Sequence, residues 1–198
     1  MNLQKIQVKL ATHYYLEAID GIYDASLQTK SKLEKELAQQ AKEISADATL
    51  DAEEMQYMLS SLGDDLFMAE MTTELAGEMM VVALYKTIEI AIKRMTKASG
   101  LFTPAQLDSF FRVSELKKQL KKKVCDIETL NKYKAYDELR CINNAIKHSG
   151  IVGTELAAYP GFKKGQKLSD LHNHYYRLRN DVDSFLIALQ DKIIATIP

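Results

Sequence analysis

Three residues near the end of a predicted helix could act together on a phosphate group: Arg140, Asn144 and His148. Their four-residue spacing places them on one ridge of an α-helix, at about 100° per residue. A guanidinium neutralises phosphoryl oxygens through paired N–H donors, and an imidazole takes or gives a proton near neutral pH. These three residues therefore form the candidate catalytic set, in which Arg140 holds the phosphate, His148 is the general acid or base, and Asn144 orients the imidazole or donates to the phosphate.

The stretch ELRCINNAIKHSG (138–150) contains two adjacent asparagines, Asn143 and Asn144, which hold a helix less well than Glu, Lys or Ala. A helical wheel puts four apolar residues on one side: Ala135, Leu139, Ile142 and Ile146. The opposite side is polar and includes Lys147, with Asn143 at its border. We expect Asn143 and Lys147 to contact RNA beside the catalytic set. The alternative is an ordinary polar face on which His148 interacts with the helix dipole.

The segment NNAIKH (143–148) resembles the signature of HEPN domains (higher eukaryotes and prokaryotes nucleotide-binding), which are all-α and often carry Arg-Asn-x-x-x-His near a helix end. Asn144 and His148 match the Asn and His of that motif. Asn143 stands where the motif has Arg, and Arg140 lies one turn earlier. The following segment ELAAYPGFKKGQKL (155–168) is also similar to HEPN-like proteins that share this variant, so the resemblance covers residues 137–178.

The resemblance implies a metal-independent endoribonuclease of a bacterial stress or phage-defence system, such as a toxin with its antitoxin. Cleavage would use the RNA 2′-OH as nucleophile and need no cofactor. The resemblance also implies a homodimer with the site at its interface, and an antitoxin or a neighbouring defence protein as a further partner. Relatives without the motif act as binding or scaffold domains. Asn143 therefore leaves open a noncatalytic dimeric interaction module, or a module that binds a nucleotide or RNA with a degenerate site.

A basic stretch precedes the ridge. Residues 112–134 carry eight basic and three acidic residues, and we expect Lys117, Lys118, Lys121 and Lys122 to bind RNA because such a stripe can follow a phosphate backbone. The alternative is a solvated helix face. In contrast, residues 51–78 carry eight acidic residues and no Lys or Arg. That acidic segment could dock against the basic stretch, within one molecule or across a dimer.

The elements that must position these residues are helical. Only 8 Gly and 3 Pro interrupt the chain, and apolar residues recur at three-to-four spacing, which predicts one all-α, HEPN-like domain over 1–198 with five to seven helices. Residues 1–47 are expected to form one long helix or a helix pair, bent or divided at Gly21. Thr49 or Asp51 should cap a short helix that Gly63 ends, and the next helix should reach about residue 97.

The second half of the chain has clearer boundaries. Thr103 and Pro104 predict the start of one or two short helices over 105–123. A helix over 126–148 should follow and end at Ser149-Gly150, and Ser169 should cap a last helix that reaches about residue 196. The irregular segment 150–168 between these two helices is the best candidate for a functional loop.

Composition limits the other possibilities. Six methionines occur among apolar residues at core spacing and are expected to fill the core rather than form a flexible binding surface: Met58, Met68, Met71, Met79, Met80 and Met95. Cys125 and Cys141 do not follow a metal-binding spacing with each other or with the histidines, which predicts free thiols, no metal site and a cytoplasmic protein. No apolar run is long enough for a bilayer, so no membrane partner is expected.

Overall fold

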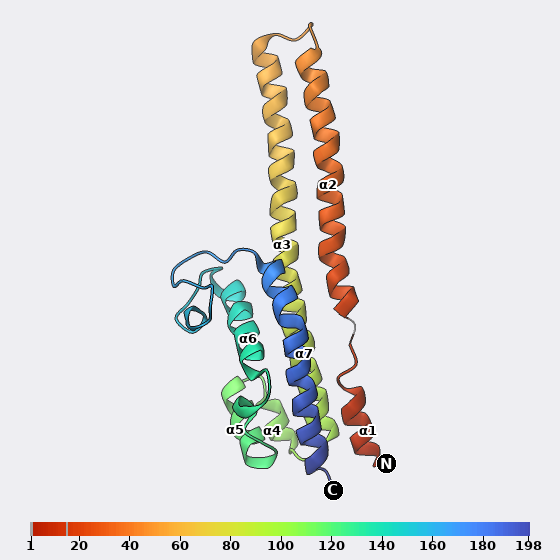
Figure 1. The fold of residues 1–198 in the computed structure, drawn as a ribbon, viewed down its shortest axis with the longest axis vertical. Coiled ribbons are helices and arrows are strands. Elements are labelled where there is room, and N and C mark those ends of the chain that lie inside the picture. Colours follow the sequence, from red (N-terminus) through yellow and green to blue (C-terminus); the bar gives the residue numbers. More distant parts are fainter. Residues whose placement is uncertain (1, 15) are drawn as a thin grey trace.

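The computed structural model describes residues 2–14 and 16–198, of which seven α-helices form the framework (Figure 1). These helices are α1 Leu3–Leu10, α2 Leu16–Ala46, α3 Ala52–Ala98, α4 Pro104–Asp108, α5 Val113–Lys123, α6 Tyr133–His148 and α7 Leu171–Thr196. Two 3-10 turns accompany them, η1 Ile127–Thr129 and η2 Leu156–Ala158. The described residues are 77% helical and form no strand, only one isolated bridge between Ile151 and Lys167. The expected all-α helical bundle is confirmed.

The N-terminal region is a helix pair that divides before residue 16, so the expectation of a division at Gly21 is wrong. Gly21 lies inside α2, while residues 11–14 are not helical. Gln190 of α7 explains where α1 ends, because its side-chain amide donates to the carbonyls of Val8 and Lys9 and to the Thr12 hydroxyl. These hydrogen bonds satisfy acceptors at the C-terminus of α1 that would otherwise need a further helical turn.

Helix α3 runs for 47 residues without a break, so the expected end at Gly63 is wrong. Asp51 caps its start as predicted, since the Asp51 carboxylate accepts from the backbone N–H groups of Glu53 and Glu54 in a capping box. Glycine within a helix costs only about 1 kcal/mol relative to alanine. Packing of Leu62 and Leu66 along the α2 groove offsets that cost, so the helix continues.

The uninterrupted α3 predicts the sign of a substitution at Gly63. We expect Gly63→Ala to raise the free energy of unfolding by about 0.5–1 kcal/mol, because the backbone is helical and nothing lies within 4 Å of the added Cβ. The same change at Gly150, where φ is +64°, should destabilise the protein. Urea denaturation of both variants measures the two effects. Loss of stability in Gly63→Ala would mean that α3 ends there.

Two boundaries in the second half need correction, and two are confirmed. Thr103 caps α4 with Pro104 in the first turn, and Gly150 ends α6 with its N–H bonded to the Ala145 carbonyl at 2.8 Å. The helix expected over 126–148 starts only at Tyr133, because Lys132 adopts a left-handed conformation after η1. The cap expected at Ser169 is also wrong. The residue that precedes α7 is Asp170, which has a left-handed backbone, and no side chain caps the start of this helix.

The core lies where α3, α6 and α7 meet, in the lower half of the molecule in Figure 1. Leu139 and Ile142 of α6 are fully buried there, as the helical wheel predicts. The upper parts of α2 and α3 project beyond this body as a two-helix hairpin. Met80 and Met95 are buried in the core. The core expectation is wrong for four methionines, which are 41–62% exposed: Met58, Met68, Met71 and Met79.

None of the helices in the described part of the chain has the length and apolar character needed to cross a bilayer.

Candidate functional site at the end of α6

Helix α6 positions the candidate site because its apolar side binds two other helices at once. The Tyr136 ring stacks on Phe185 of α7, with ring centroids 4.7 Å apart, and lies 6.4 Å from the Tyr85 ring of α3. Leu139 and Ile142 continue that contact with no exposed surface. The outward side of α6 therefore has a defined orientation, and it carries the predicted ridge.

The ridge divides into two parts. Asn144, Lys147 and His148 are exposed in the last turns of α6, whereas the Arg140 side chain is only 16% exposed. Arg140 and His148 are eight residues apart, which is about 12 Å along the helix axis. The Arg140 guanidinium also reaches back toward Asp137, away from His148. The structure thus places Asn144, Lys147 and His148 in the exposed last turns of α6, with Lys147 Nζ 5.9 Å from the centroid of the Tyr85 ring, and directs the Arg140 guanidinium away from them.

Arg140 is held by a polar cluster, here called the Asp137 cluster: Asp137, Arg140, Glu155 and Tyr159. Arg140 Nε donates to Asp137 Oδ1 at 2.9 Å, and its Nη2 donates to Glu155 Oε2 at 3.0 Å. The Tyr159 hydroxyl donates to Asp137 Oδ2 at 2.7 Å. Glu155 and Tyr159 belong to the predicted loop 150–168. Two residues of that loop are therefore bound to the ridge, and the candidate phosphate-binding arginine already has two carboxylate partners.

The charges of the cluster stabilise one another. Burial opposes ionisation of Asp137, but hydrogen bonds from Arg140 and Tyr159 outweigh burial and lower its pKa. Burial also works against the charge of Arg140, yet Asp137 and Glu155 raise its pKa above the usual value. Nearby, burial raises the pKa of the Cys141 thiol to about 11. Asp137 and Arg140 thus form a stable ion pair, and the neighbouring Cys141 thiol is protonated at neutral pH.

Asn143, which occupies the position of the motif arginine, does not reach the surface. Its side chain is 1% exposed, and neither its amide nitrogen nor its amide oxygen has a hydrogen-bond partner among the described residues. Asn143 is seven residues after Tyr136, so the two share one helix face within about 20°. That face contacts α3 and α7, and Asn143 therefore points into the helix packing rather than toward a ligand on the ridge.

The unpartnered amide predicts a stabilising substitution. We expect Asn143→Leu to raise the free energy of unfolding by about 1–3 kcal/mol, because leucine has a similar shape and leaves no buried polar atom without a partner. Asn144→Leu is the matched control, since Asn144 is exposed and measures only the helix propensity of leucine. Urea denaturation separates the two. Equal effects at both positions would mean that the Asn143 amide has a partner in solution.

The predicted basic stripe on α5 is largely paired within the chain. Lys117 Nζ lies 2.9 Å from a Glu128 carboxylate oxygen, and Lys121 Nζ lies 2.6 Å from one of Asp126. Lys118 faces Glu115 at 3.7 Å. The three acids counted in this stretch thus each oppose one of its lysines. Lys122 is the fourth lysine of the stripe and is exposed in the last turn of α5.

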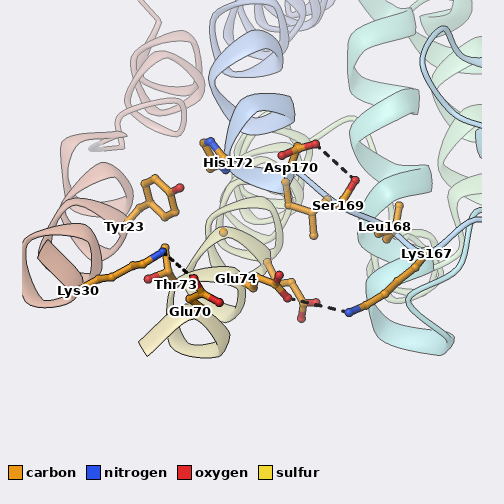
Figure 2. A pocket seen from close by; sticks show the side chains of 13 residues that line it. Tyr23, Lys30, Glu70, Thr73, Glu74, Lys167, Leu168, Ser169, Asp170 and His172 are labelled. Carbon is orange, nitrogen blue, oxygen red and sulfur yellow. Dashed lines mark hydrogen bonds and ion pairs between the residues drawn. The ribbon is translucent and has the colours of Figure 1, made fainter. Parts of the chain in front are cut away.

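A pocket of about 550 Å³, which the sequence did not predict, lies where α2, α3 and the start of α7 meet the end of the loop (Figure 2). The Tyr23 ring stacks on His172 with centroids 4.8 Å apart. Lys30 faces Glu70 at 3.6 Å, and Lys167 faces Glu74 at 4.0 Å. Its residues come from segments far apart in the sequence and share no motif, so no local signal could have identified it.

No group of three or more His, Cys, Asp or Glu side chains is placed to hold a metal ion within residues 2–14 and 16–198. Comparison of the chain with protein-family models, with curated proteins and with solved structures gave no match.

Proposed function

We propose that the chain is a HEPN-like helical interaction module with a degenerate site, which works by binding rather than by cleaving RNA. The observation that carries this proposal is the geometry of the two arginine positions. Arg140 is engaged by Asp137 and Glu155, and Asn143 is buried. A general base and a phosphate-binding arginine must both reach one phosphate at hydrogen-bond distance. The separation of Arg140 from His148 along α6 does not meet that requirement within one chain.

The role of the Asp137 cluster supports the proposal. Its hydrogen bonds join α6 to the loop, and Phe162 of the loop stacks on His174 of α7 with ring centroids 4.6 Å apart. The polar residues that resemble a catalytic motif thus connect the loop to two helices. On this proposal Arg140 is a structural residue, and Asn143 and Asn144 belong to a degenerate motif that lacks its arginine.

A ribonuclease is the second candidate, and one observation favours it. Asn144, Lys147 and His148 form an exposed polar group at the end of α6. In a homodimer with this end at its two-fold axis, arginine could come from the partner subunit. His148 would then act as general acid or base on the RNA 2′-OH, without a metal.

One assay decides between the two candidates. The wild-type protein and His148→Ala are incubated with a mixed RNA pool in EDTA, and fragments and 2′,3′-cyclic phosphate ends are measured. We expect no cleavage by either protein. Cleavage by the wild type that falls by about 10²–10⁴-fold in His148→Ala would instead establish the ribonuclease, since general acid–base catalysis contributes about that much. Equal cleavage by both proteins would indicate a contaminating nuclease, and repurification would then remove it.

A further inference from the structure

The projecting hairpin carries an apolar stripe on α3 that is mostly turned away from α2, although Met68 at its upper end also lines a pocket with Ala25, Ser26 and Thr29 of α2. The stripe consists of Met68, Met71, Leu75 and Met79, which are 62%, 44%, 55% and 49% exposed. Thr73 marks the opposite side of α3, because its hydroxyl accepts from Ser26 of α2 at 3.2 Å. Leu75 lies two residues further, about 160° around the helix from Thr73. The stripe thus lies mostly on the side of α3 opposite the side that packs on α2, and Figure 1 shows this part of α3 beside α2 in the projecting hairpin.

The spacing of the stripe fits a partner helix. Steps of three, four and four residues keep the four side chains on one seam, which runs for about 16 Å or three turns. Such a seam accepts a helix that presents apolar residues at similar spacing. Three of the four residues are methionines, whose unbranched side chains adapt to the shape of a bound surface.

The charged residues of α3 beside the stripe are acidic. A lysine near them is Lys30 of α2, which lines a pocket with Met68 and Asp65 and pairs with Glu34 and Glu70. Asp64 lies one turn before Met68 on the same seam, and Asp65 and Glu78 lie at its two edges. The ion pairs among the described residues do not include these three carboxylates, and residues 51–78 contain no Lys or Arg. A helix that covers the stripe would therefore bring its flanking residues next to carboxylates that form no ion pair, which favours Lys or Arg at those positions.

We propose that this face of α3 binds a cationic amphipathic helix of a partner protein. A second copy of the chain fits poorly, because a two-fold contact between α3 stripes would bring Asp64, Asp65 and Glu78 of each copy toward the same acids of the other. RNA and anionic membrane surfaces are repelled by these carboxylates for the same reason. The inference deepens the proposed interaction function and rests on it for the premise that the chain works by binding.

The test uses the full chain and labelled helical peptides of about 18 residues, with binding followed by fluorescence anisotropy. The first peptide has leucine at the heptad a and d positions and lysine at e and g. A second has glutamate in place of lysine, and a third has the composition of the first with its leucines dispersed around the helix. We expect only the first peptide to bind, with an affinity that falls as salt is added.

Two matched variants locate the binding face. Met71→Gln/Leu75→Gln should weaken binding of the first peptide at least about tenfold, whereas Phe111→Gln/Ile187→Gln, which changes two exposed apolar residues elsewhere, should not. Circular dichroism verifies that both variants keep their helix content. Asp64→Asn/Glu78→Gln should lower the affinity and flatten its salt dependence.

Several outcomes would overturn the inference: no binding of the first peptide, equal binding of the dispersed peptide, or equal affinity in the two apolar variants. Sedimentation provides a further outcome. A wild-type dimer that Met71→Gln/Leu75→Gln converts to monomers, without peptide binding, would assign the face to a second copy. RNA cleavage by the wild type would overturn the noncatalytic function while leaving peptide binding on α3 unaffected, so the two proposals fail separately.

Discussion

Replacing Asp137 with alanine should lower the free energy of unfolding by about 3–4 kcal/mol at neutral pH. The Asp137 carboxylate is 18% exposed and accepts from both Arg140 and Tyr159. Its removal leaves a largely buried guanidinium with only the exposed Glu155 as carboxylate partner, and leaves the Tyr159 hydroxyl without its acceptor. Breaking a buried pair from one side has a cost of this size because the remaining charge stays out of water. Urea denaturation at pH 7 measures the difference.

The effect of Asp137→Ala should depend on pH in one direction. The folded state lowers the pKa of Asp137, so the carboxylate stabilises the protein fully above its unfolded pKa of about 3.9 and loses this contribution as pH falls through the folded pKa. The gap in stability between wild type and variant should therefore shrink below about pH 4. Glu36→Ala is the control, because the Lys32–Glu36 pair on α2 is exposed and contributes little. A gap that does not depend on pH would argue against an ionised Asp137.

Arg177→Ala should lower the free energy of unfolding by about 3 kcal/mol. Two nitrogens of Arg177 on α7 pair with the two carboxylate oxygens of Glu138 on α6, and the Glu138 side chain is only 7% exposed. Removal of the arginine leaves a buried carboxylate without its partner. The expected cost is near the lower end for buried pairs because the Arg177 side chain is half exposed. Urea denaturation again provides the measurement, with exposed Lys32→Ala as control.

A second substitution should rescue this variant. In Arg177→Ala/Glu138→Leu neither charge is present, so we expect the double variant to be more stable than Arg177→Ala, since the second substitution removes the buried carboxylate that has lost its partner. The rescue distinguishes an uncompensated charge from simple loss of packing. A double variant less stable than Arg177→Ala would mean that the arginine acts through its own contacts with α7 and the loop.

The Asp137–Arg140 and Glu138–Arg177 pairs bear on function because both lie on α6 just before the segment 143–148 that resembles a nuclease motif. Glu138 and Arg140 each bind a group outside α6, on α7 and on the loop respectively. If both variants lose stability as expected, the residues ELR at 138–140 serve mainly to join these segments. Such a result agrees with a binding module, and the RNA assay then tests catalysis at His148, one of the exposed residues at the end of α6.

Much of the fold could be predicted because its signals are local. The all-α class followed from apolar spacing and scarce Gly and Pro, and the caps at Asp51 and Thr103 followed from side chains that bond the adjacent backbone. The helix end predicted at Gly63 was wrong because that prediction also used only a local signal. A glycine permits a helix end without requiring one, and packing of α3 on α2 decided that the helix continues. HEPN membership and RNA contact at Lys117, Lys118, Lys121 and Lys122 remain predictions.

The sequence by itself determined which residues of α6 share a side, since a helix rotates by about 100° per residue wherever it lies. Only the tertiary structure decided how wide the buried side is. Helix α6 contacts both α3 and α7, so burial extends around to Asn143, and the loop returns to occupy Arg140 with Glu155. The reverse holds for α3, where periodicity predicted apolar residues but no second layer covers Met68, Met71 and Leu75. Periodicity records which residues avoid water, whereas burial depends on which neighbours the chain brings to that side.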